Sequence, residues 1–232
     1  MSAAGGAMSR WWAKARGLDD AAERGHRPDP HRWVVLDVES SGLDAARDRL
    51  IAIAAIAVRV DTGKAPRIDL GDSFEVVLAQ PQSANGAAVD KQNILIHGIG
   101  VQAQRQGVPP VEGLKAFERW LADAPVMAFH AAFDETLLQR SMQATLGRRL
   151  PNAWLDLADI ARVLEPDSRA RSLDDWLALR GISCAVRHQA ASDALATAEL
   201  MLALWPGVLA QRVTPDWDGL ARLAAQRRWL AR

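Results

Sequence analysis

Residues 34–43 read VVLDVESSGL, and this stretch decides the fold. Residues 33–38 are mostly apolar and β-branched, which is the composition of a buried strand. Two acids, Asp37 and Glu39, stand at the end of this run, and Gly42 follows them. Residues two apart on a strand point to the same face, roughly 6–7 Å apart. The stretch therefore predicts a buried strand that ends in two neighbouring carboxylates, with Gly42 allowing a sharp turn beyond it.

Two further segments carry acids beside apolar residues. Asp134 follows FHAAF at 129–133, and Asp193 follows RHQAAS at 187–192, which includes His188. A buried carboxylate is costly unless a positive group meets it, and no Lys or Arg stands inside the first two of these three segments. A pair of divalent cations would neutralise all four acids together.

The expected secondary structure brings these segments toward one place. A short apolar strand over 125–129 ends shortly before Asp134, and Asp193 lies near the start of an apolar helix over 190–204, where the helix dipole favours an anion. Open sheets place their sites at such strand ends. Strands followed by alternating helices and strands predict a mixed sheet with helices on its faces. The other expected elements are strands over 50–60, 73–78 and 154–157, and helices over 108–122, over 134–146, from Ser172 onwards and over 219–230.

The composition bounds the function without assigning it. The 232 residues are enough for one sizeable core and a small appendage, and 49% hydrophobic with 24% charged residues is ordinary for a globular protein. A formal net charge of +0 excludes a strong overall basic field but allows an enzyme that holds few nucleotides and takes its positive charge from metal ions. The single Cys184 excludes an intramolecular disulfide, so a cytoplasmic setting is expected. No apolar stretch is long enough to predict a membrane span, and the first residues do not predict a secretory signal.

The order of the three acidic segments resembles the DnaQ-like, or DEDDh, family of 3′–5′ exonucleases, which includes the proofreading epsilon subunit of bacterial DNA polymerase III. The resemblance covers roughly residues 32–204, and the three motifs are specific together although each is common alone. It implies an α/β, ribonuclease H-like fold with a mixed five-stranded sheet and helices on both faces. The chain then divides into an N-terminal helical appendage and linker (1–31), an exonuclease domain (32–204) and a C-terminal helical extension (205–232).

The resemblance also implies a two-metal site. Asp37 would bridge two cations, and Glu39, Asp134 and Asp193 would complete their ligands. Hard oxygen ligands select Mg²⁺ or Mn²⁺, and two such ions about 3.5–4 Å apart can hold the attacking and leaving oxygens of a phosphodiester. His188 would be the general base, since an imidazole with its ordinary pKa of about 6.5 accepts protons near neutral pH. Relatives carry His or Tyr at this position, and this chain contains no Tyr.

A substrate-binding surface is implied beside the metals. Ser40 and Ser41 would hold the 3′ hydroxyl and phosphate, and Leu43 would wedge against the last base. Phe133 would pack on sugar or base, and the segment His97-Gly98-Ile99 matches a family segment that flanks the site. The residues expected to contact substrate are Ser40, Ser41, Gly42, Leu43, His97 and Phe133.

Two positions depart from the family pattern, and several other residues are expected to be structural. Serines replace the usual Thr-Thr at 40–41, which keeps the hydroxyls, whereas Ala131 replaces an Asn and removes a hydrogen-bonding group that bears on substrate preference. The residues expected in structural roles are His130 (packed and hydrogen-bonded), Asp156, Asp174 and Asp175 (turns or helix caps), and Trp120, Trp176 and Trp205 (core rather than base stacking).

The sequence thus favours a metal-dependent 3′–5′ exonuclease that releases nucleoside 5′-monophosphates from single-stranded DNA ends, in proofreading or repair, with a DNA polymerase as the partner that the resemblance suggests. Two alternatives stay open. One is an exoribonuclease on short RNA, since no residue is identified that reads the 2′ hydroxyl. The other is a non-catalytic nucleic-acid-binding module on the same fold, against which the intact ligand set argues. The oligomeric state is left open.

Overall fold

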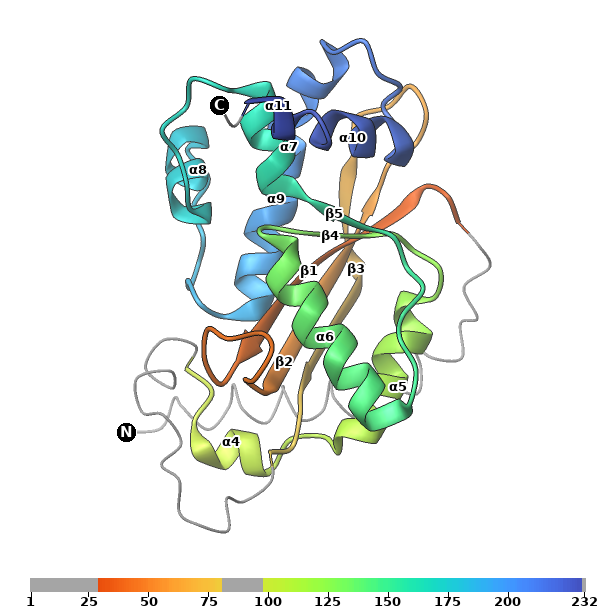
Figure 1. Ribbon diagram of the computed structural model, residues 1–232, viewed down its shortest axis with the longest axis vertical. Coiled ribbons are helices and arrows are strands. Elements are labelled where there is room, and N and C mark those ends of the chain that lie inside the picture. The colour runs from red at the N-terminus through yellow and green to blue at the C-terminus, as the bar shows by residue number, and fades with distance from the viewer. Residues whose placement is uncertain (1–28, 81–97, 231–232) are drawn as a thin grey trace.

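A computed structural model describes residues 29–80 and 98–230, and its centre is a five-stranded sheet of order β3-β2-β1-β4-β5 (Figure 1). β1 pairs antiparallel with β2, as β2 does with β3, whereas β4 is parallel to β1 and β5 is parallel to β4. The expected mixed sheet of five strands is confirmed. The strands are β1 (Arg32–Ser40), β2 (Leu50–Arg59), β3 (Arg67–Val77), β4 (Val126–Ala128) and β5 (Trp154–Asp156).

Helices cover both faces of this sheet, and each face has its own cluster of buried apolar side chains. The helices of one face are α5 (Pro110–Leu121) and α6 (Ala131–Leu146), and those of the other are α7 (Leu157–Leu164), α8 (Leu173–Arg180), α9 (Ala190–Leu209) and α10 (Trp217–Ala224). Two short helices, α4 (Val101–Arg105) and α11 (Arg227–Leu230), complete the described chain. Within it, every helix is too short or too polar to span a bilayer.

Alternation along β1 decides which face receives the acids. The even-numbered residues of 33–38 pack against α5 and α6, and the odd-numbered ones lie on the face that α9 covers. Asp37 and Glu39 continue the odd-numbered series, so they lie on the α9 face. In register with them, β2 carries Ala54 and Ala52. These small side chains leave room for two carboxylates and for the start of α9.

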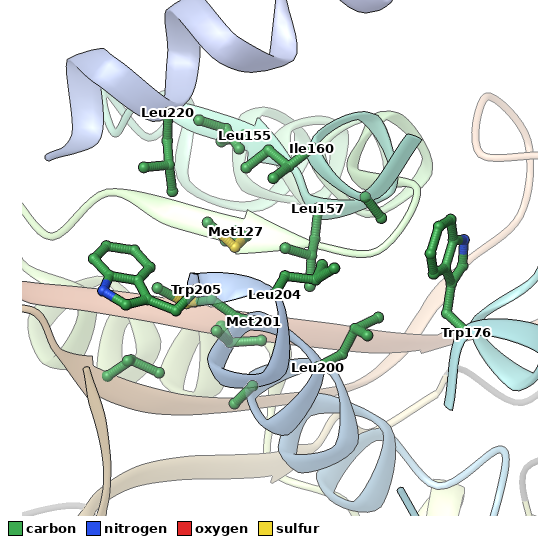
Figure 2. Close-up of a cluster of buried hydrophobic side chains, with 14 of the residues drawn as sticks. Met127, Leu155, Leu157, Ile160, Trp176, Leu200, Met201, Leu204, Trp205 and Leu220 are labelled. Carbon is green, nitrogen blue, oxygen red and sulfur yellow. The ribbon is translucent and has the colours of Figure 1, made fainter. Parts of the chain in front are cut away.

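The larger apolar cluster holds α9 against the sheet. Figure 2 shows side chains of α9, Trp205 among them, gathered with Met127 of β4 and with residues of α7. The sequence predicts the end of this helix at residue 204, but the helix continues through Pro206 to Leu209. Pro206 cannot donate a backbone hydrogen bond inside the helix. The burial of Trp205 and Val208, which are 4% and 2% exposed, offsets that loss.

Several elements differ from the expectation. α7 was not expected; it starts directly after β5 because Asp156 caps it, accepting a hydrogen bond from the backbone N–H of Ala158 at 2.9 Å. α4 was also not expected. β3 starts at Arg67, six residues before the expected start at residue 73, and the expected single helix over 219–230 is divided into α10 and α11. The expected core positions of Trp120, Trp176 and Trp205 are confirmed, since all three are buried. The appendage over 1–31 lies outside the described residues up to position 28, as does His97.

Candidate active site

A cleft of about 510 Å³ opens at the carboxyl ends of β1 and β4. Since these strands are parallel neighbours, their carboxyl ends meet at one edge of the sheet. The lining comes from the end of β1, from the start of α6 and from the segments that lead into α8 and α9. All five residues that the sequence predicts as metal ligands or general base line this one cleft: Asp37, Glu39, Asp134, His188 and Asp193.

Asp37 and Glu39 are the acids of β1. Burial, followed by the negative charges of Asp134, Glu39 and Asp193, raises the pKa of Asp37 well above its usual value. Burial and the charges of Asp193 and Asp134 raise the pKa of Glu39 to about 8, although a hydrogen bond from the backbone N–H of Ala190 opposes that rise. Among the described residues, these two carboxyl groups therefore have too little positive charge nearby to offset their burial and mutual repulsion.

Asp134 lies in the first turn of α6 and is 5% exposed. Its Oδ1 accepts a hydrogen bond from the backbone N–H of Val38 at 3.2 Å, which ties α6 to the end of β1. Burial raises the pKa of Asp134 to about 8, and the charge of Asp156 acts in the same direction against the effect of the backbone N–H groups. Asp134 is thus a third acid whose negative charge is destabilised in the folded chain.

Asp193 lies in the first turn of α9 and differs from the other three acids by having a cationic partner. It is 5% exposed, and its Oδ1 accepts a hydrogen bond from Nη1 of Arg187. Its Oδ2 accepts the backbone N–H of His188 at 3.0 Å. Burial acts to lower the pKa of Arg187, but its hydrogen bonds to Asp174 and Asp193 outweigh burial and raise it. Arg187 is therefore a fixed positive charge beside the fourth acid.

Two histidines line the cleft, and both have left-handed backbone conformations. His188 is exposed and has a φ of 59°, and His130 is exposed and has a φ of 62°. Such angles are uncommon for residues other than glycine and gather at functional sites. The backbone N–H of His130 donates to Asp156 Oδ1 at 3.0 Å, and its Nε2 lies 3.3 Å from the carbonyl oxygen of Arg171. His130 is hydrogen-bonded, as expected, but it belongs to the cleft wall rather than to a packed interior.

The loop after β1 presents Leu43, which is 94% exposed and lines the cleft. The three residues before it shape the loop instead of lining the cleft. Ser40 donates its hydroxyl to the carbonyl of Gly42, and the hydroxyl of Ser41 bonds to Asp48 Oδ1 at 3.0 Å. A Cβ added to Gly42 would lie 2.5 Å from the Asp48 carboxylate, so glycine allows this carboxylate to pack closely against the loop, and the φ of Gly42 is not in the left-handed region.

Arg140 ties this loop to α6. Its Nε donates to the carbonyl of Ala45 at 3.1 Å, and its Nη2 donates to the carbonyl of Asp48. The helix that carries Asp134 therefore also holds the loop that carries Leu43. Phe133, the neighbour of Asp134, lines the same cleft.

The segment around residue 98 lies beside the loop of His188. An added Cβ on Gly98 would be 3.9 Å from Nε2 of Gln189, the residue that follows His188. Gly98 has a φ of 70°, a conformation that favours glycine. His97 itself lies outside the described residues.

Sequence reasoning missed several residues of the cleft. The most important is Arg187, which directly precedes His188 and supplies a positive charge in the third segment. The sequence contained a signal for it, because Arg187 is a cation directly beside His188 in the third acidic segment. Four residues have no signal in sequence, since they reach the cleft only through the fold; these are Phe129, Arg171, Ser172 and Leu173.

The four acids fit a divalent-cation site by their chemistry. They are hard oxygen donors around one cleft, and mutual repulsion with burial makes a positive partner favourable. As the side chains stand, no three His, Cys, Asp or Glu residues within 29–80 and 98–230 form a ready-made ion cluster. The donor set is therefore suitable, and the side chains would have to close around the ions.

Comparison with known proteins identifies relatives of the domain. Residues 34–201 match RNase_T, a family described as exonuclease. A DNA polymerase III PolC-type protein of Clostridium perfringens is 26% identical over 170 residues, which cover 73% of this chain and 11% of that protein. A DNA polymerase III subunit epsilon-like protein of Rhodobacter capsulatus is 30% identical over 190 residues, which cover 80% of this chain and 25% of that protein. The chain thus spans a quarter or less of the length of these two relatives.

Solved structures share the fold. The zinc-ion-bound form of the complex of E. coli exonuclease I with single-stranded DNA aligns with a TM-score of 0.62 at 19% identity, over 77% of this chain and 41% of that chain. This likeness confirms the ribonuclease H-like arrangement of a mixed five-stranded sheet between helices.

Proposed function

Because this chain belongs to the RNase_T family of exonucleases, we propose that it is a 3′–5′ exonuclease that hydrolyses single-stranded DNA and releases nucleoside 5′-monophosphates. The observation that carries this proposal is the cleft in which four acids and one histidine from three distant segments face a common space. Its volume of about 510 Å³ lies in the range of ligand pockets.

The acids hold two divalent cations, Mg²⁺ or Mn²⁺, in this proposal. Asp37, Glu39, Asp134 and Asp193 would hold these ions. The bound ions would supply Lewis-acid activation of water and stabilisation of the departing 3′ oxygen. The raised pKa values of Glu39 and Asp134 support the assignment, because carboxylates that repel one another gain most from a cation.

His188 acts as the general base. It takes a proton from the attacking water and passes it to solvent, which its exposed position at the cleft allows. The N–H of its backbone bonds to Asp193, so the ring is attached to a metal ligand through a short stretch of chain. This connection orients base and metal site together.

The terminal nucleotide is held by the cleft walls. Leu43 is an exposed apolar side chain at the mouth and packs on the last base, and Phe133 contacts the sugar or base. Ser40, Ser41 and Gly42 hold the shape of the Leu43 loop and offer backbone groups to the 3′ hydroxyl. DNA is favoured over RNA as the substrate. The names of the two relatives contain DNA polymerase III, and the exonuclease I structure is a complex with single-stranded DNA.

The relatives also support a polymerase partner. Both named relatives are DNA polymerase III proteins, and this chain matches only a part of each. We extend the proposal to an association with the replicative DNA polymerase of the same organism. Co-elution of the two purified proteins in gel filtration checks this, and separate elution at micromolar concentrations argues for an independent nuclease.

A digestion assay tests the activity. A single-stranded DNA labelled at its 5′ end should shorten stepwise with Mg²⁺ or Mn²⁺ and release nucleoside 5′-monophosphates. Asp37→Asn should lose this activity, and Asp61→Asn should keep it, because Asp61 pairs with Lys64 on the surface. An RNA of matched sequence and a DNA with a blocked 3′ end complete the set. No digestion with either metal, or digestion unchanged in Asp37→Asn, contradicts the proposal, and faster digestion of RNA reassigns the substrate.

A further inference from the structure

Arg187 is a positive side chain within a cleft of acids. The lining contains one other arginine, Arg171, whose Nη1 donates to backbone carbonyls of its own loop. Arg187 instead bonds to two carboxylates, through Nη1 to Asp193 and through Nε to Asp174. Its side chain is 26% exposed, and that of Asp193 is 7% exposed. Of these two arginines, Arg187 is the one that bonds to a residue proposed to bind metal.

A cation that binds Oδ1 of Asp193 has to displace Arg187. The Oδ2 of Asp193 accepts the N–H of His188 at 3.0 Å, and its Oδ1 accepts Nη1 of Arg187 with Sγ of Cys184 at 3.5 Å. Both oxygens are thus engaged by the chain itself. A cation on Oδ1 would lie beside a guanidinium group of the same sign, and the burial of the Asp193 side chain, which is 7% exposed, limits how far solvent screens their repulsion. The metal and Arg187 therefore compete for one carboxylate.

We propose that Arg187 exchanges partners: it neutralises Asp193 in the metal-free protein, and with the cations bound it contacts the phosphate of the 3′-terminal nucleotide. This inference rests on the proposed function, because it needs ions and a nucleotide in the cleft. It also explains why the acids line one cleft without forming a ready-made ion cluster among the described residues.

The geometry keeps Arg187 close after the exchange. Asp174, whose side chain is 57% exposed at the rim, remains bonded to Nε. Nη1 then becomes available, and a guanidinium presents its N–H groups as a planar fork that matches phosphate oxygens. Arg187 thus becomes a phosphate-binding residue when the metals take Asp193.

Two binding measurements test the exchange without relying on turnover. The first is calorimetric titration of Mn²⁺ into metal-stripped protein. Arg187→Gln and Arg171→Gln each remove one positive charge from the cleft lining, but only Arg187→Gln removes a contact to Asp193. We expect Arg187→Gln to bind Mn²⁺ about three- to tenfold more tightly and Arg171→Gln to stay within about twofold of the unaltered chain.

The second measurement titrates thymidine 5′-monophosphate into the Mn²⁺-saturated proteins, with thymidine as the phosphate-free control. Arg187→Gln should bind the monophosphate about tenfold more weakly, because a charge-assisted hydrogen bond is lost, and should bind thymidine as before. Arg187→Lys keeps the positive charge but lacks the planar fork, so its affinity for the monophosphate should lie between that of the unaltered chain and that of Arg187→Gln. It also serves as the test variant if thermal melting shows that Arg187→Gln does not fold.

The outcomes separate this inference from the proposed function. An unchanged Mn²⁺ affinity in Arg187→Gln, an equal gain in Arg171→Gln, or tighter Mn²⁺ binding with unchanged monophosphate binding each overturns the exchange and leaves the nuclease proposal standing. If the unaltered chain binds no Mn²⁺, the proposed function and this inference both fail.

Discussion

The two ends of β1 carry two charged clusters that are built in opposite ways. At its start, Arg32 is 1% exposed and bonds to Asp72 through Nε at 2.7 Å and Nη2 at 3.1 Å. It also donates to two carbonyls at the end of α5 and lies over a tryptophan ring. Arg59, its register partner on β2, pairs with Asp29, Asp69 and Asp72. In this cluster each of the three carboxylates has a guanidinium partner.

At its other end, about 25 Å along a strand of this length, four acids meet one guanidinium among the residues that the structure describes. Asp37, Glu39 and Asp134 have raised pKa values, and only Asp193 bonds to Arg187. A buried pair that is complete fixes structure, whereas an incomplete set leaves charge that a ligand can neutralise. β1 thus has a charge cluster that is compensated at its start and one that is not fully compensated at its end. Four experiments test this contrast.

The largest effect is expected from Asp37→Asn. Loss of a group that merely hydrogen-bonds a metal ligand costs about 10- to 100-fold, so loss of a ligand should lower the rate of nucleotide release by more than about 10³-fold. In the metal-free protein the same change removes a carboxyl group whose negative charge the site destabilises, so the melting temperature at pH 8 should hold or rise. Activity assays and melting curves check the two halves. A much lower melting temperature of the metal-free variant would mean that the Asp37 carboxylate stabilises the fold, as the ion-paired carboxylate of Asp72 does at the start of β1.

Removal of the imidazole is expected to have the next largest effect. His188→Ala should lower turnover by about 10²- to 10⁴-fold, because general-base assistance contributes that much, and should leave Mn²⁺ affinity nearly unchanged. His130→Ala is the matched control, since His130 is also exposed, left-handed and part of the cleft wall. It should cost less than about tenfold. A larger loss in His130→Ala than in His188→Ala would reassign the base.

At the start of β1 the expected effect is on stability. Asp72→Asn breaks a pair whose side chains are 2% and 13% exposed, and breaking such a buried pair costs about 3–5 kcal/mol of unfolding free energy. Urea denaturation measures this loss, and activity per folded molecule should not change. Asp61→Asn on the surface should stay within about 0.5 kcal/mol. A loss of activity without a loss of stability in Asp72→Asn would erase the contrast between the two ends.

The fold and the acids could be predicted because their signals are local. β1 is a run of apolar residues whose two acids share a face. Asp134 and Asp193 lie in the first turns of helices that apolar patterns predict. The position of these acids at strand or helix ends then follows from topology. A single chain therefore contains enough information to gather the four acids, although their detailed arrangement does not follow.

What the sequence did not predict depends on contacts between distant residues. α9 runs through Pro206 because Trp205 and Val208 are buried in the larger apolar cluster, where Trp205 contacts Trp33 of β1, and no local rule predicts this. α7 was missed because β5 and the helix meet at one residue, where Asp156 caps the helix. Arg187 was visible in sequence, but its bond to Asp193 depends on the turn between them.

The last prediction concerns the pH dependence of the metal-free protein. Glu39 and Asp134 have folded-state pKa values of about 8, above the ordinary carboxyl values of 4.5 and 3.8 that apply after unfolding. Between those values the folded chain binds protons that the unfolded chain has released, so the free energy of unfolding must fall as pH rises from about 4 to about 8. Melting curves in EDTA should therefore move to lower temperature over this window.

Two controls sharpen this prediction. Asp134→Asn removes one of the titrating groups, so its melting temperature should fall less steeply with pH. Mn²⁺ should stabilise the unaltered chain more at pH 8 than at pH 6, because at lower pH the ion must first displace protons from the acids. A melting temperature that rises from pH 5 to pH 8 without metal would show that the acids at the end of β1 are already compensated by charges of the chain. The contrast with the arginine-paired cluster at the start of β1 would then be lost, and with it the main physical reason to place cations in the cleft.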